Sequence, residues 1–124
     1  MSKIAFVVPD LDQAIKDYAD LFGLDAKSAT RGKRSGVDTA TLRFANGVAL
    51  ELNQPQDGTS IWQTHLQKHG RSIFSVAFRV PSIREQIPYL QSKGGTLVAG
   101  GADARYAYFD FTSRLGTVIE AHEQ

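Results

Sequence analysis

Short apolar runs alternate with segments of helical periodicity along the chain. The first run, Ile4–Val8, is rich in β-branched residues, and apolar positions at helical spacing follow it from 11 to 22. Strand-like runs come next, weakly near 26–30 and then clearly over 37–45 and 48–53. This pattern predicts one strand, one helix and three further strands in the first half of the chain.

The second half of the chain repeats this order. Residues 76–83 match residues 4–11 at Ala, Phe, Val and Pro positions, an offset of 72 residues. A second match, at an offset of 69 residues, makes Glu120 the counterpart of Glu51. The later strands are expected at 96–99, 105–111 and 117–122, so the sequence predicts two βαβββ units.

Local signals set the ends of these elements. Asp10 with Gln13, and Ser82 with Glu85, have the spacing of a helix N-terminal capping box. Asn46-Gly47 is a strong hairpin signal, and Pro88 should kink or shorten the second helix. A short helix from Ser60 to Gly70 is expected between the units.

Composition narrows the class of protein. The 124 residues are 42% hydrophobic and 22% charged, which predicts a single domain, 1–124, made of modules 1–57 and 71–124 joined by the short helical segment. A net charge of +1 argues against binding to nucleic acid or to an anionic membrane. Cysteine is absent, which excludes disulfides and thiolate chemistry. Neither a signal peptide nor an apolar run of membrane-spanning length is visible, so a cytoplasmic location is expected.

Paired βαβββ units, with several phrases in the right order, resemble the vicinal oxygen chelate superfamily. Val8-Pro9-Asp10-Leu11-Asp12 and Leu21-Phe22-Gly23-Leu24 are similar to the first strand and helix of its methylmalonyl-CoA epimerase and glyoxalase I branch. Leu66-Gln67-Lys68-His69-Gly70 resembles the epimerase junction between modules, and residues 105–120 resemble its final hairpin. The resemblance implies an α+β fold in which two βαβββ modules form an open, curled, barrel-like sheet with a central cleft.

The resemblance also implies where a metal would bind in relatives that use one. Their two His and two Glu or Gln ligands fall here on Lys3, Glu51, Ser75 and Glu120. Both carboxylates are present, but a cation and a neutral hydroxyl replace the imidazoles, so we expect neither a metal nor another cofactor. In the epimerases a further catalytic carboxylate precedes the third strand, where this chain has Lys33, Arg34 and Ser35. The usual epimerase route is therefore not expected.

Strand alternation selects the side chains that face the expected cleft. We assign Glu51 and Glu120 as candidate general bases and Lys3 as an electrostatic group. The candidate ligand-binding residues are Ser75, Arg79, Arg43, Asn53, Tyr106, Tyr108 and His122. The alternative is a structural salt-bridge network that replaces the charge of the metal. Arg31, Lys33 and Arg34 are interpreted as a solvated loop, and His65 and His69 as a partly exposed helix face.

These assignments favour an enzyme of the isomerase or lyase type. It would act on a small oxygenated carbonyl metabolite by proton transfer, without the standard metal. The rival hypothesis is a non-catalytic protein of the bleomycin-resistance type that sequesters a small molecule. A third is a metal enzyme that uses Glu51, Glu120 and His122. A homodimer is expected because members of the family commonly pair.

Overall fold

The structure is a computed structural model that describes residues 1–34, 36–56 and 58–123. Two compact units make up the chain: Lys3–Phe74, here called the first module, and Met1–Ser2 with Ser75–Gln124, the second module. Position 57, the expected end of the first βαβββ unit, lies outside the described residues.

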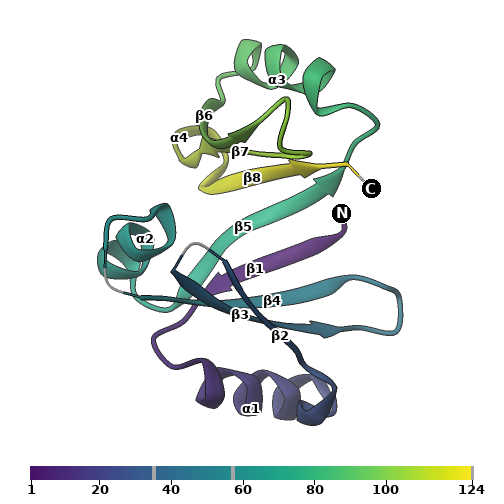
Figure 1. Ribbon diagram of the computed structural model, residues 1–124, viewed down its shortest axis with the longest axis vertical. Coiled ribbons are helices and arrows are strands. Elements are labelled where there is room, and N and C mark those ends of the chain that lie inside the picture. Colours follow the sequence, from purple (N-terminus) through teal and green to yellow (C-terminus); the bar gives the residue numbers. More distant parts are fainter. Residues whose placement is uncertain (35, 57, 124) are drawn as a thin grey trace. The chain divides into compact units, whose positions relative to one another are not determined.

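The first module contains one four-stranded sheet and two α-helices (Figure 1). Its sheet order is β2-β3-β4-β1, with β1 parallel to β4 and the other neighbours antiparallel. The elements are β1 (Lys3–Val7), α1 (Leu11–Phe22), a 3₁₀ turn η1 (Ala26–Ser28), β2 (Thr30–Arg34), β3 (Val37–Arg43), β4 (Ala49–Pro55) and α2 (Ile61–His69).

The second module repeats this arrangement in the order β5-β8-β7-β6, with β5 parallel to β8. Its elements are β5 (Ser72–Arg79), α3 (Ile83–Ser92), β6 (Thr96–Gly101), β7 (Tyr106–Phe111), the one-turn helix α4 (Thr112–Leu115) and β8 (Thr117–His122); the first residues of β5 belong to the first module. The predicted α+β class and the two βαβββ units are therefore confirmed.

The predicted helix caps are present. The side chains of Asp10, Ser60 and Ser82 accept hydrogen bonds from the backbone N–H three residues later, which satisfies a donor that the first helical turn leaves open. Gly23 ends α1 in the left-handed conformation, with φ of 68°. Local sequence therefore determines where these helices begin and where α1 ends.

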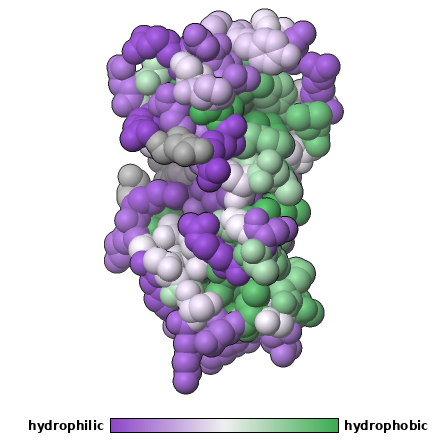
Figure 2. Space-filling view, turned by 90° about the vertical axis from the view of Figure 1, so that its right-hand side faces the viewer, coloured by the Kyte–Doolittle hydropathy of each residue, from purple (hydrophilic) through white to green (hydrophobic). Residues whose placement is uncertain are grey.

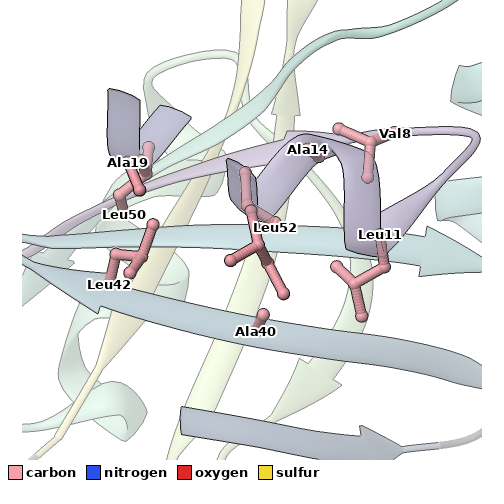
Figure 3. Close-up of a cluster of buried hydrophobic side chains, with 9 residues drawn as sticks. Val8, Leu11, Ala14, Ala19, Ala40, Leu42, Leu50 and Leu52 are labelled. Carbon is pink, nitrogen blue, oxygen red and sulfur yellow. The ribbon is translucent and has the colours of Figure 1, made fainter. Parts of the chain in front are cut away.

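In the first module, α1 lies along one face of the sheet and buries an apolar core against it. Figure 3 shows this core: side chains from the helix, among them Leu11 and Ala14, point toward Leu42, Leu50 and Leu52 of the strands. In the second module, α3 covers the equivalent face, where Ile83 packs with Phe109 and Phe111. Because strand side chains alternate, the opposite face of each sheet carries a different set of residues, and the candidate site residues lie there.

Two predictions about individual segments are wrong. Residues 26–28 form a 3₁₀ turn, and the strand follows at Thr30–Arg34, so the basic segment expected to be a solvated loop is a strand paired to β3. Phe78, expected to pack beneath the second helix, is 41% exposed.

Hydrophobic side chains also reach the surface, where green atoms lie among purple ones in Figure 2. The large exposed hydrophobic residues include Leu21, Phe22, Ile73, Phe78, Tyr89 and Leu115. Within the described residues, none of the helices is both long and apolar enough to cross a membrane.

Candidate functional site

Strand register places the candidate residues of the first module on the face opposite α1. Glu51 of β4 pairs with Ala5 of β1 and Thr41 of β3, and Asn53 pairs with Val7 and Thr39. Lys3 lies two residues before Ala5, so its side chain leaves the sheet on the same face as Glu51. The predicted grouping of Lys3, Glu51 and Asn53 on one face is consistent with this register.

The centre of this face is a carboxylate bound by two cations. Lys3 Nζ donates to Glu51 Oε2 at 3.1 Å, and Arg34 donates from a guanidinium nitrogen to Glu51 Oε1 at 3.0 Å. The side chain of Glu51 is only 10% exposed, and that of Lys3 is 17% exposed. Each oxygen of Glu51 therefore has its own cationic donor, in a setting where water screens the charges weakly.

Arg34 is held in position by further contacts. The same guanidinium nitrogen donates to Asn53 Oδ1 at 2.9 Å, and the Asn53 amide donates to the carbonyl oxygen of Phe6 at 3.0 Å. The guanidinium carbon lies 5.0 Å from the ring centre of Trp62 in α2, within the range of a cation–π interaction. Asn53 and Trp62 thus hold the Arg34 guanidinium in its orientation toward Glu51.

This arrangement changes the acidity of Glu51. Burial by itself raises the pKa of a carboxyl group, but the charges and hydrogen bonds of Lys3 and Arg34 outweigh it and lower the pKa of Glu51 below its ordinary value of 4.5. A carboxylate that is stabilised in its ionised form is a weak general base. Glu51 is therefore better suited to balancing charge than to removing a proton.

The second module presents a corresponding face. Glu120 of β8 pairs with Ala77 of β5, as Glu51 pairs with Ala5 of β1, and it pairs with Tyr108 of β7 on its other side. Glu120 is 5% exposed and Tyr108 is 3% exposed. A buried carboxylate and a buried phenol therefore lie on directly paired positions of the sheet.

His122 lies two residues beyond Glu120 on the same face, and a serine holds it. Its Nε2 is 2.6 Å from the hydroxyl oxygen of Ser2, and its Nδ1 is 3.2 Å from the carbonyl oxygen of Glu123. The same hydroxyl donates to the carbonyl oxygen of Ala77 at 3.3 Å, so Ser2 connects His122 to β5. Sequence reasoning missed Ser2, since 120 residues separate it from its partner.

The remaining residues of the second module differ in burial. Ser75 is fully buried, and within the described part of the chain its hydroxyl has no hydrogen-bond partner. Arg79, which pairs with His122, is exposed and lines a pocket of about 470 Å³ together with Arg105 and Glu123. Tyr106 is 42% exposed, and its ring lies edge-on to that of Tyr108 at 5.8 Å.

Two basic residues of the first module share the face of Glu51. Arg43 shares the site face by register but lies at the exposed end of β3, opposite Ala49. Arg34, which the sequence assigned to a loop, instead contacts Glu51 directly. The available signal was the alternation Thr30, Gly32, Arg34, which matches Thr41, Thr39 and Val37 across the pair of strands.

The geometry does not fit a metal at Glu51. Each of its carboxylate oxygens accepts a hydrogen bond from a cation, and a divalent ion would have to displace both donors. Across residues 1–34, 36–56 and 58–123, no cluster of three or more His, Cys, Asp or Glu side chains could hold a metal ion. The rings of His65 and His69 are tilted against each other with their centres 4.6 Å apart. His65 also contacts Ser72 and Phe74, which makes it part of the packing of α2.

Solved structures with this fold include enzymes. A hypothetical protein from Bacillus halodurans matches all of this chain and 93% of its own, with a TM-score of 0.81 and 23% identity. Methylmalonyl-CoA epimerase from Mycobacterium tuberculosis matches 98% of this chain and 85% of its own, with a TM-score of 0.74 and 26% identity. A variant of the Streptomyces coelicolor methylmalonyl-CoA epimerase, solved with 2-nitronate-propionyl-CoA, matches 100% of this chain and 96% of its own, with a TM-score of 0.76 and 20% identity.

Comparison of the sequence with curated proteins gave no match. A family profile, in contrast, matches residues 2–109, which is most of the chain. The match begins just before β1 and ends within β7. The two βαβββ units described above agree with that match. The chain therefore belongs to the glyoxalase/bleomycin resistance protein/dioxygenase superfamily.

Proposed function

We propose that this protein is an isomerase or lyase that transfers a proton next to the carbonyl group of a small oxygenated metabolite, without a metal. The observation that carries the proposal is the difference between its two buried carboxylates. Lys3 and Arg34 bind both oxygens of Glu51, and Glu120 is directly paired with the buried phenol Tyr108, two residues before His122 on β8. The second carboxylate is the candidate general base.

The reaction follows from the chemistry of these groups. A Glu120 oxygen removes the proton from the carbon next to the carbonyl, and the electron pair moves to the carbonyl oxygen to give an enolate. The Tyr108 hydroxyl or the Arg79 guanidinium stabilises the enolate oxygen. Return of a proton to carbon completes an isomerisation, while loss of a leaving group from the neighbouring carbon completes an elimination.

His122 and the two arginines fit this scheme. His122 Nε2 lies 2.6 Å from the Ser2 hydroxyl oxygen, a distance at which a proton can pass between the two groups. Arg79 and Arg105 line the neighbouring pocket, where they suit an anionic group of the substrate. Carboxylates, phosphates and the phosphates of a CoA thioester share that chemistry, and the epimerase complex named above contains such a thioester.

The proposal is tested by following exchange of the carbon-bound proton. Candidate 2-oxo acids and acyl-CoA thioesters are first screened by thermal shift, and the ones that bind are incubated with the protein in D₂O. We expect deuterium to enter the position next to the carbonyl, detected by NMR. The Glu120→Gln variant should slow this exchange by about 100-fold or more.

Glu85→Gln is the matched control, because Glu85 is an exposed carboxylate on α3. It should leave the exchange rate unchanged. Exchange that survives in Glu120→Gln at the normal rate would contradict the role of Glu120. Stoichiometric metal together with loss of exchange on chelation would contradict the metal-free mechanism.

The second candidate is a protein that binds and sequesters a small molecule. The double ion pair of Glu51 favours it, because that pairing removes one of the two carboxylates from acid–base chemistry. The same experiment separates the two candidates: tight binding of a carbonyl compound without deuterium incorporation supports sequestration.

We also propose that the chain forms a homodimer, as the family resemblance implies, and that it is located in the cytoplasm. Sedimentation equilibrium at micromolar concentration measures whether the protein is a dimer. A monomer at high micromolar concentration would contradict it.

A further inference from the structure

A second pocket lies in the second module, on the helix-covered face of its sheet. Its volume is about 360 Å³, which is within the range of small-molecule sites. Phe78 of β5, Leu90 of α3, Phe111 of β7 and Ile119 of β8 supply apolar walls. Ile119 adjoins Glu120 in the strand, so the pocket opens on the opposite face from the candidate general base.

The first module shows why this space is open. There, a ladder of aromatic rings lines the interface between helix and sheet, with Phe22 at its exposed end: Phe6 lies 4.9 Å from Tyr18, Tyr18 lies 6.3 Å from Phe22, and Phe22 lies 5.5 Å from Phe44. The repeat offset of 72 residues places Phe78 at the position of Phe6.

The same offset places Leu90 at the position of Tyr18 and Gly94 at that of Phe22. Two rings of the ladder are thus replaced by smaller residues, and Phe78 remains 41% exposed. The missing rings leave an apolar surface without its partner.

The rim of the pocket is positively charged. Lys93, at the C-terminal end of α3, and Arg114 of α4 both line it. A guanidinium nitrogen of Arg114 donates to the carbonyl oxygen of Lys93 at 2.6 Å, which keeps the two residues together. The described residues that line the pocket include neither Asp nor Glu. A complementary ligand therefore has an apolar body and a negative end.

We propose that this pocket binds a small amphipathic carboxylate, with its chain or ring against Phe78 and Leu90 and its carboxylate between Lys93 and Arg114. The proposal does not depend on the reaction assigned to Glu120. It adds a ligand site on the other face of the second module's sheet.

The test is an NMR titration of the ¹⁵N-labelled protein with decanoate, kept below the concentration at which it forms micelles. We expect saturable shifts in α3, α4 and β8. Uncharged 1-decanol and cationic decyltrimethylammonium should bind at least tenfold more weakly, because neither can use the two basic side chains. Equal binding of the cation, or shifts spread evenly over both modules, would overturn the proposal.

Two variants address the walls and the rim separately. Leu90→Tyr supplies the ring that the first module has at this position and should abolish decanoate binding. Lys93→Gln combined with Arg114→Gln changes only exposed side chains and should raise the dissociation constant at least tenfold. Lys16→Gln, an exposed lysine on α1, is the matched control and should bind normally. If Leu90→Tyr does not fold, the variant that combines Lys93→Gln with Arg114→Gln tests the proposal by itself. Unchanged decanoate binding in that variant would overturn the proposal.

Discussion

The two modules repeat the same βαβββ build, yet they treat equivalent positions in opposite ways. Glu51 and Glu120 correspond in the repeat and have the same register against β1 and β5. Lys3 and Ser75 also correspond, so the first strand carries an ammonium at the position where β5 carries a buried hydroxyl. The repeat thus fixes the positions of the carboxylates, while single substitutions decide their chemistry.

The helix–sheet interfaces differ in the same manner. The first module lines its interface with four aromatic rings in mutual contact, whereas the second has a pocket beside Leu90. Burial raises the pKa of the Tyr18 hydroxyl, and the charge of Arg71 only partly opposes this, which is consistent with a packed ladder. We infer that the first module contributes more of the stability and that the second module carries the binding surfaces.

The largest expected change in stability comes from opening the aromatic ladder. Tyr18→Leu gives the first module the residue of the second, and it removes two ring contacts of Tyr18. The free energy of unfolding should fall by about 2 kcal/mol, from lost burial and lost aromatic pairing. Urea denaturation measures this value.

The reverse swap, Leu90→Tyr, is the comparison for that measurement. It fills an existing pocket, so we expect the free energy of unfolding to change by about 1 kcal/mol or less. Equal destabilisation by both swaps would break the proposed difference between the two interfaces.

A somewhat smaller effect is expected when the ion pair of the first module is removed. Lys3→Ser copies the residue of the second module and leaves Glu51 with Arg34 alone. The loss of a partly buried, charge-assisted hydrogen bond should cost about 1.5 kcal/mol. Thermal or urea unfolding provides the measurement.

Lys33→Ser is the control for Lys3→Ser. Lys33 makes an exposed ion pair with Asp38 at 3.5 Å, and such surface pairs contribute little. We expect an effect under about 0.5 kcal/mol. If Lys33→Ser destabilised the protein as much as Lys3→Ser, burial of the Glu51 cluster would not matter as argued.

The third expected effect is a loss of stability at low pH that depends on Glu51. Because the pKa of Glu51 is lower in the folded chain than its ordinary value of 4.5, the ionised form stabilises the folded state above that pH. This contribution is lost as the pH falls through the folded-state pKa, since the folded protein must then take up a proton. The wild type should therefore lose more stability between about pH 6 and about pH 3 than Glu51→Gln does.

Urea denaturation curves at several pH values compare these two proteins. Glu120→Gln serves as the second comparison, because it removes the corresponding carboxylate from the other module. Parallel pH profiles for the wild type and Glu51→Gln would contradict the ion-pair interpretation.

The smallest expected effect is that of a chelator. With both oxygens of Glu51 bound by cations, EDTA should leave the melting temperature unchanged. Protein purified without chelators should carry far less than one Zn²⁺, Ni²⁺ or Co²⁺ per chain by elemental analysis. A drop in melting temperature on chelation would show that a metal displaces Lys3 or Arg34.

The sequence alone determined the local structure and the site faces. Capping residues such as Asp10 and Ser82 act within one helical turn, so their effect can be read without knowing the fold. Strand alternation works in the same local way and correctly grouped Lys3, Glu51 and Asn53. The internal repeat then extended the assignment to Glu120.

Tertiary structure decided which of these side chains have partners. Arg34 became a partner of Glu51 because β2 pairs with β3, a pairing that the alternation Thr30, Gly32, Arg34 indicates only weakly because these residues are not apolar. Ser2 reaches His122 only because the chain brings its two ends together within the second module. Phe78 and Leu90 likewise line one pocket although they belong to different elements, which only the folded chain brings together. Capping and periodicity act between residues that are close in sequence, whereas ion pairing and packing depend on distances that only the folded chain defines.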